Sequence, residues 1–224
     1  MQFKFKIQPY QTAAADAVTA VFEGQPNQDT YTYLRDLGSV KTRQGMGSLF
    51  SMDQLESQEG YANAPLVVDP YDLLRNINRI QSRGQLEESD KLSNDIGACQ
   101  LDVEMETGTG KTYVYTKTMF ELNRLYGWSK FIIVVPSVAI REGVFKSLQN
   151  TEQHFFEQYG KSIRYFIYDS DRLNELDSYS QSDGINAMII NMQAFNSSMK
   201  EGASNKAARI IFDERDDFGS RRPI

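Results

Sequence analysis

The sequence predicts an α/β fold with a mostly parallel central sheet and helices on both faces. Short apolar runs alternate along the chain with longer segments of helical periodicity, which is the pattern of strands joined by crossover helices. The run at residues 130–135 is continuously apolar after its first residue and rich in β-branched side chains, so we expect a strand buried on both faces. A glycine-rich loop also stands between a strand-like stretch at residues 101–104 and a helix-like stretch at residues 113–126.

The N-terminal part predicts a strand followed by a helix. Apolar residues alternate with polar ones over residues 2–8, which is typical of a strand. Pro9 suits the first turn of a helix that extends to residue 23, before Gly24. The expected apolar face of this helix consists of Tyr10, Ala14, Ala17 and Val21.

The remaining elements follow from periodicity and end signals. A helix is predicted between Pro70 and Gly84, with Asp69 as its N-cap. Another is predicted over residues 138–149, with Ile140, Val144 and Leu148 facing inward. Further strands are expected at residues 65–69, 163–168, 187–191 and 208–212, a short helix or turn at 169–176, and the start of a helix at 192–200.

Composition limits the classes of protein. The 224 residues carry a net charge of −6, so any binding of nucleic acid must rest on local contacts. A single cysteine, Cys99, excludes an internal disulfide and fits a reducing cytoplasm. The one histidine, His154, builds no metal cluster by itself, and we find neither a membrane span nor a signal peptide.

We expect a single domain over residues 1–224 with an irregular insertion at about residues 25–95. Residues 25–63 are polar, rich in Gln, Ser, Thr and Gly, and poor in regular patterning, which favours loops and partial disorder.

The loop at residues 105–112 has the composition of a phosphate-binding loop. Glycines let several backbone N–H groups point into one concavity, and the helix that follows adds a terminus that favours an anion. We expect Lys111 to contact the β- and γ-phosphates of a nucleotide and the Thr112 hydroxyl to coordinate Mg²⁺. The alternative is an ordinary glycine turn between a strand and a helix. The predicted contacts to the nucleotide come from Glu106, Thr107, Gly108, Thr109, Gly110, Lys111 and Thr112.

The Pro-Tyr-Gln sequence at residues 9–11 resembles the adenine-sensing element of superfamily 2 helicases. In those proteins a glutamine amide contacts the edge of adenine, and Gln11 is the matching residue. A surface glutamine on a helix is the alternative.

Four stretches together resemble the Res subunit of type III restriction enzymes. Residues 105–115 are similar to the family's first helicase motif, in which Met at the position of Met105 is usual. Residues 133–143 are similar to the next motif, and residues 188–195 and 212–224 to later parts of the first motor domain. The resemblance covers nearly the whole chain except about residues 25–63, and it implies a RecA-like P-loop domain that binds ATP and Mg²⁺.

The resemblance also implies action on double-stranded DNA with a modification (methyltransferase) subunit as partner. In such motors the segment after the second strand and the start of its helix lie along one DNA strand, which makes Ser137 and Arg141 the candidates for phosphate contacts. Asn191 and Gln193 are weaker candidates. Alternatives are another superfamily 2 helicase or translocase and a non-catalytic nucleotide-binding module.

Asp213 and Glu214 have the form of an acidic pair that holds Mg²⁺ and polarises water. Only three apolar residues precede them, and Asp216 stands where the family carries His or Gln. We therefore expect the catalytic acid to lie beyond residue 224, with little ATP turnover by this chain alone. No lysine has an acid two places before it, so no nuclease site is predicted here.

Overall fold

The computed structural model describes residues 5–28, 31–34, 59–93, 99–169 and 173–194. The chain divides into two compact units, which are described separately. The first comprises Met1–Asp29, Asn63–Ser129 and Lys146–Ser162, and the second comprises Thr30–Ala62, Lys130–Phe145 and Ile163–Ile224.

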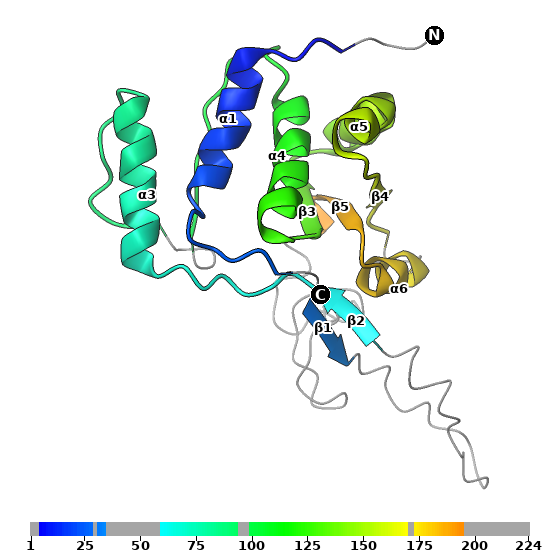
Figure 1. The fold of residues 1–224 in the computed structure, drawn as a ribbon. Helices are drawn as coiled ribbons and strands as arrows, with labels where there is room; N and C mark the ends of the chain where they lie inside the picture. The colour runs from blue at the N-terminus through cyan, green and yellow to red at the C-terminus, as the bar shows by residue number, and fades with distance from the viewer. Residues whose placement is uncertain (1–4, 29–30, 35–58, 94–98, 170–172, 195–224) are drawn as a thin grey trace, which may run out of the picture. The chain divides into compact units, whose positions relative to one another are not determined.

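Helices build the first unit. Helix α1 (Pro9–Ala20) lies beside helix α4 (Lys111–Tyr126), and helix α3 (Pro70–Arg83) lies on the other side of α1 (Figure 1). The buried positions of α1 are Gln11, Ala15 and Thr19, one turn apart. Of the predicted apolar face, Val21 is buried, whereas Tyr10 is 51% exposed and Ala14 and Ala17 are only partly buried. The buried face of the helix is therefore rotated, and the small Ala15 on it permits close packing.

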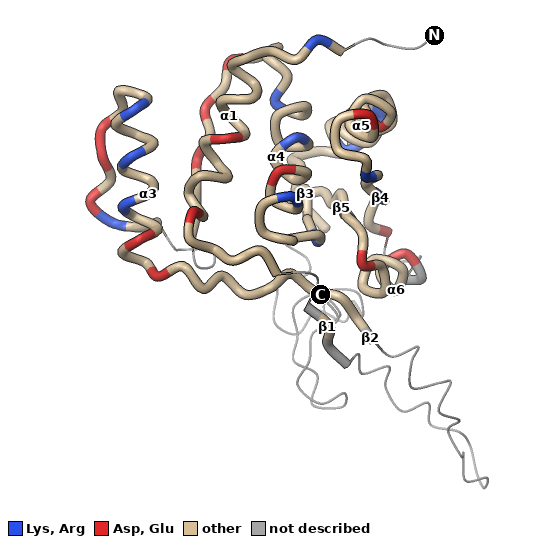
Figure 2. The backbone as a smooth tube through the Cα atoms, in the orientation of Figure 1, with Lys and Arg blue, Asp and Glu red and all other residues tan. Residues whose placement is uncertain are grey.

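Helix α3 begins and ends where its capping residues predict. The Asp69 carboxylate accepts a hydrogen bond from the Asp72 N–H at 2.9 Å, Pro70 is the first helical residue, and Gly84 is the C-cap. The Asn76 amide donates to two carbonyls at the end of α1, each at 3.0 Å. Figure 2 shows basic residues along α3, whose acidic residue Asp72 is in its first turn. Arg75 pairs with Asp72 and Arg79 with Glu23, which fits a solvated helix face.

The residues that flank positions 29–62 on both sides are hydrogen-bonded near the last turn of α4. The Asn27 side chain donates to the Arg124 carbonyl at 3.1 Å. On the other side, the Trp128 indole donates to the Ala64 carbonyl at 3.0 Å, and the Ser129 N–H donates to Asn63 at 2.8 Å.

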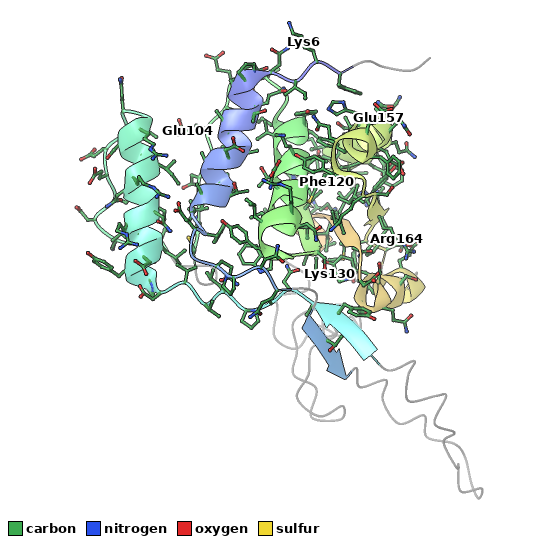
Figure 3. All side chains as sticks on the ribbon, in the orientation of Figure 1. Lys6, Glu104, Phe120, Lys130, Glu157 and Arg164 are labelled. Atoms are coloured by element: carbon green, nitrogen blue, oxygen red, sulfur yellow. The ribbon has the colours of Figure 1, made fainter. Side chains whose placement is uncertain are left out.

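Helix α5 (Val138–Tyr159) supplies its second half to the first unit. The ring of Phe120, labelled in Figure 3, stacks on Phe155 and Tyr159 with centroids 5.1 and 4.9 Å apart. The Tyr159 hydroxyl donates to the Glu121 carboxylate at 2.7 Å and accepts from the Lys117 ammonium at 3.0 Å. Burial of these charges is tolerated because each has a hydrogen-bonding partner.

A parallel sheet organises the second unit. It contains β3 (Lys130–Val135), β5 (Ile185–Asn191) and β4 (Ile163–Ile167) in the order β3-β5-β4. The predicted mixed α/β class and parallel pairing are confirmed. The strand buried along its length is β5, the middle one, whereas Ile132 and Val134 of β3 are 38% and 37% exposed. The prediction that β3 is buried on both faces was wrong.

Two other features complete the second unit. Strands β1 (Tyr31–Leu34) and β2 (Glu59–Ala62) pair antiparallel inside the region predicted to be irregular. Helix α6 (Leu173–Gln181) contacts β2 and β5. The Lys130 ammonium donates to the Tyr179 carbonyl at 2.5 Å and to the Ser182 carbonyl, and burial lowers the pKa of Lys130 to about 8.

Several predicted boundaries change. Residues 5–8 and 65–69 form no strand, and α5 extends ten residues past its predicted end at residue 149 to Tyr159. Within α5, Val144 and Leu148 are buried as predicted, but Ile140 is 48% exposed. Residues 192–194 are helical, as expected, and the predicted strand at 208–212 lies outside the described residues.

Among the described residues, no helix is long and apolar enough to cross a membrane. The same residues contain no group of three or more His, Cys, Asp and Glu side chains that is arranged to hold a metal ion.

His154 lies in an aromatic cluster of the first unit. Its Nε2 atom is 2.9 Å from the Tyr113 hydroxyl. The centroid of its ring lies 5.3–5.5 Å from the ring centroids of Phe5, Tyr113 and Phe155. Burial lowers the pKa of His154 below its ordinary value of 6.5; the Glu157 charge opposes this effect and the Lys117 charge adds to it.

We therefore predict that stability falls as the pH decreases below about 6.5, because the unfolded chain binds the imidazole proton more tightly than the folded one. Since His154 is the only histidine, its imidazole signals in a proton NMR titration should give a pKa below 6.5 without further assignment. The His154→Asn variant should lose this part of the pH dependence of the unfolding free energy. A pKa at or above 6.5 in the folded protein would contradict the prediction.

Candidate nucleotide-binding site

The loop before α4 has two glycines in the left-handed region of backbone space. Gly108 has φ +84° and Gly110, the N-cap of α4, has φ +88°. Side chains are strained at such angles. At Gly110 there is a second reason for glycine, because a Cβ atom would lie 2.6 Å from the Gln11 amide nitrogen. The backbone of the loop therefore depends on glycine at both positions.

The carbonyl of Glu106 accepts hydrogen bonds from two side chains of the loop. The Lys111 ammonium donates to it at 2.8 Å and the Thr109 hydroxyl at 2.7 Å. These bonds hold the Lys111 head group over the loop at the N-terminus of α4. The first turn of α4 contains no acidic residue, so the partial positive charge of the helix end adds to that of Lys111. An anion is the ligand that such an arrangement favours.

The start of α1 is bonded to the same loop. The Gln11 amide donates to the Thr109 carbonyl at 3.0 Å, and the Tyr10 hydroxyl donates to that carbonyl at 3.2 Å. Gln11 is buried although its side chain is polar. The structure thus brings Gln11 together with the loop, although Gln11 and Thr109 are 98 positions apart in the sequence.

The predicted strand at residues 101–104 does not form. Residues 101–106 have no regular structure, and Val103 is 50% exposed. Only two of the four residues are apolar, and they alternate with exposed Asp102 and Glu104. Such a stretch gains little side-chain packing to offset the entropy of ordering it as a strand.

Comparison with known proteins decides the family. The family model described as "Type III restriction enzyme, res subunit" matches residues 4–218. The chain belongs to the family of type III restriction enzyme Res subunits. The module that defines this family is a RecA-like, helicase-type motor domain, which agrees with the parallel sheet and helices described above.

Curated relatives carry the same description. The EcoPI Res subunit of Escherichia phage P1 is 32% identical over 73% of this chain and 15% of its own length. The EcoP15I Res subunit of Escherichia coli is 35% identical over 50% of the chain and 12% of its own length. The StyLTI Res subunit of Salmonella typhimurium is 54% identical over 26% of the chain. The chain spans about 15% or less of the relatives that it matches.

The residues predicted to contact DNA belong to the second unit of this Res-family chain. The Ser137 hydroxyl accepts a hydrogen bond from the Ile140 N–H at 3.3 Å at the start of α5. The Arg141 guanidinium is bonded to the Glu142 carboxylate at 2.9 Å. Asn191 is the last residue of β5, and Gln193 lies in the helical turn after it. Asp213 and Glu214 lie outside the described residues.

Sequence reasoning missed the contact of Tyr10 with the loop. Only the neighbouring Gln11 was selected, because the resemblance to helicases concerns the amide. The position of Tyr10 in the first turn of α1, next to Gln11, could have indicated this contact. A tyrosine there has the length to reach the loop that its neighbour contacts, as its hydroxyl does.

A groove of about 470 Å³ lies along α3 and is separate from the glycine loop at residues 105–112. The two arginines among its lining residues are paired, Arg75 with Asp72 and Arg79 with Glu23. The pairing lowers the pKa of the Glu23 carboxyl, chiefly through its hydrogen bond to Arg79. Because the charges offset one another, this groove lacks the electrostatic character that a phosphate site requires.

Proposed function

We propose that this chain binds ATP and Mg²⁺ at residues 105–112 and Gln11, as the first motor domain of a Res subunit. The observation that carries the proposal is the set of bonds from Gln11, Tyr10 and Lys111 to two carbonyls of one glycine loop. Gln11, the proposed contact for adenine, and Lys111, the proposed contact for phosphate, are thereby bonded to two carbonyls of one loop.

The chemistry of the residues suits a nucleoside triphosphate. Lys111 supplies a positive charge for the β- and γ-phosphates, and glycines at 108 and 110 leave the backbone accessible. The Thr112 hydroxyl is an oxygen ligand of the type that Mg²⁺ prefers. Contacts from the backbone of Glu106, Thr107 and Thr109 complete the site, and the Gln11 amide is the group for the adenine edge. When bound, Mg²⁺ would neutralise negative charge on the phosphates.

In the full-length protein we propose that ATP hydrolysis drives action on double-stranded DNA, together with a modification (methyltransferase) subunit in the cytoplasm. The names of the relatives, which are Res subunits of type III restriction-modification enzymes, support this proposal. The net charge of −6 does not oppose it, since phosphate contacts are local and include helix N-termini. Ser137 and Arg141 at the start of α5 are the proposed contacts.

We predict that Lys111→Ala weakens ATP binding by at least about tenfold, because a charge-assisted hydrogen bond to phosphate contributes roughly 1.5–3 kcal/mol. Titration calorimetry with ATP and Mg²⁺ measures the change. Lys146→Ala removes an exposed lysine of α5 and is the matched control, for which the affinity should remain unchanged. Equal heats and affinities for the wild type and Lys111→Ala would refute the phosphate site.

We predict that Arg141→Ala weakens binding of double-stranded DNA and reduces the slope of log K against log salt by about one, as expected for one lost phosphate contact. Fluorescence anisotropy over a series of salt concentrations measures both quantities. The control is Arg164→Ala, which removes an exposed arginine of β4. If both variants change the slope equally, the contact is not specific to Arg141.

A further inference from the structure

The hydroxyl of Tyr115 is buried in the structure without a hydrogen-bonding partner among the described residues. Tyr115 lies in the first turns of α4, three residues after Thr112. A buried hydroxyl without a partner is unfavourable, and each one calls for an explanation. A phenylalanine would provide the same ring for packing without this cost.

Three other tyrosine hydroxyls of the first unit form hydrogen bonds. The Tyr113 hydroxyl is 2.9 Å from His154, the Tyr126 hydroxyl donates to the Thr19 carbonyl at 2.8 Å, and the Tyr159 hydroxyl donates to Glu121 at 2.7 Å. Tyr115 differs from these three, although it is on the same helix as Tyr113 and Tyr126.

Helix geometry directs Tyr115 toward the phosphate loop. Side chains of a helix lean toward its N-terminus, so a long residue covers the turn before its own position. Residues three apart are neighbours on one face, which makes Thr112 the neighbour of Tyr115. The two side chains are therefore one helical turn apart on one face of α4, and the buried Tyr115 hydroxyl has no hydrogen-bonding partner among the described residues.

The chemistry expected of Thr112 supplies a reason for this pair. An alcohol whose oxygen coordinates a divalent cation becomes a stronger hydrogen-bond donor, because the metal withdraws electron density from the oxygen. Its O–H group then needs an acceptor. The phenolic oxygen of Tyr115 is an acceptor that no other described residue uses.

We propose that Tyr115 is a positioning residue for Mg²⁺, whose hydroxyl oxygen accepts a hydrogen bond from Thr112 when the Thr112 oxygen coordinates the metal. This inference rests on the proposed function of residues 105–112. Tyr115 itself touches neither the nucleotide nor the metal. It fixes the rotamer of Thr112 and thereby directs a lone pair of that oxygen toward Mg²⁺.

The test is the affinity for ATP of the 224-residue chain in excess Mg²⁺ and in EDTA, measured by calorimetry. For Tyr115→Phe we expect an affinity about three- to tenfold lower in Mg²⁺, the range for one hydrogen bond, and an unchanged affinity in EDTA. Tyr115→Leu also lacks the hydroxyl and is measured in parallel, so that the result does not depend on the packing of one variant.

Tyr113→Phe is the matched control, because it removes the hydroxyl of the adjacent tyrosine, which is bonded to His154 on another face of α4. Its ratio of affinities in Mg²⁺ and EDTA should equal that of the wild type. In a Thr112→Ala background, Tyr115→Phe should have no further effect, since a residue that acts only through Thr112 has nothing left to position.

Two results would overturn the inference. One is an equal loss of affinity in Mg²⁺ and in EDTA, which would indicate a general structural role for Tyr115. The other is full retention of the Mg²⁺ dependence in both Tyr115 variants. Either result, with a wild type that binds ATP more tightly than Lys111→Ala does, refutes the role of Tyr115 and leaves the nucleotide site intact. A wild type that binds ATP no better than Lys111→Ala removes the proposed function and this inference with it.

Discussion

The bond from the Gln11 amide to the Thr109 carbonyl is the contact on which the candidate site depends. It brings the amide nitrogen to 2.6 Å from the position of a Cβ atom at residue 110, where the positive φ of +88° already favours glycine. Burial of Gln11 in turn requires α1 to lie close along α4, which the small Ala15 permits. One polar contact therefore connects the loop to the packed pair of helices α1 and α4.

Helix α4 links the loop to the rest of the first unit. Its first turn carries Lys111 and Thr112, and its middle stacks on α5 through Phe120. Just after the helix, the Trp128 indole donates a hydrogen bond to the Ala64 carbonyl. Buried charges between α4 and α5 have hydrogen-bonding partners, as with Lys117 and Tyr159. A helix supported over its whole length gives the glycine loop a rigid boundary, which is what the proposed nucleotide site requires.

Features with strong local causes were predictable from the sequence. The caps of α3, the end of α4 before Gly127 and the parallel strands each follow from a few neighbouring residues, although α4 begins at Lys111, two residues before its predicted start. Features decided by tertiary contacts were not. The buried face of α1 includes Gln11, whose amide bonds to a loop 98 positions away, and the small Ala15, while β5 is the buried strand because of its central position in the sheet. Residues 101–104 form no strand, since they lack the packing that strands need.

If the start of α1 and the glycine loop at residues 105–112 form one nucleotide site, as we propose, ATP should affect both segments together. Amide hydrogen exchange with ATP and Mg²⁺ tests it most directly, because it reports on both segments in one experiment. The account predicts that exchange slows together in residues 9–13 and 105–114 with ATP, and that GTP slows it in the loop but less around Gln11. Protection confined to other parts of the chain, or no change in either segment at saturating ATP, would contradict the account.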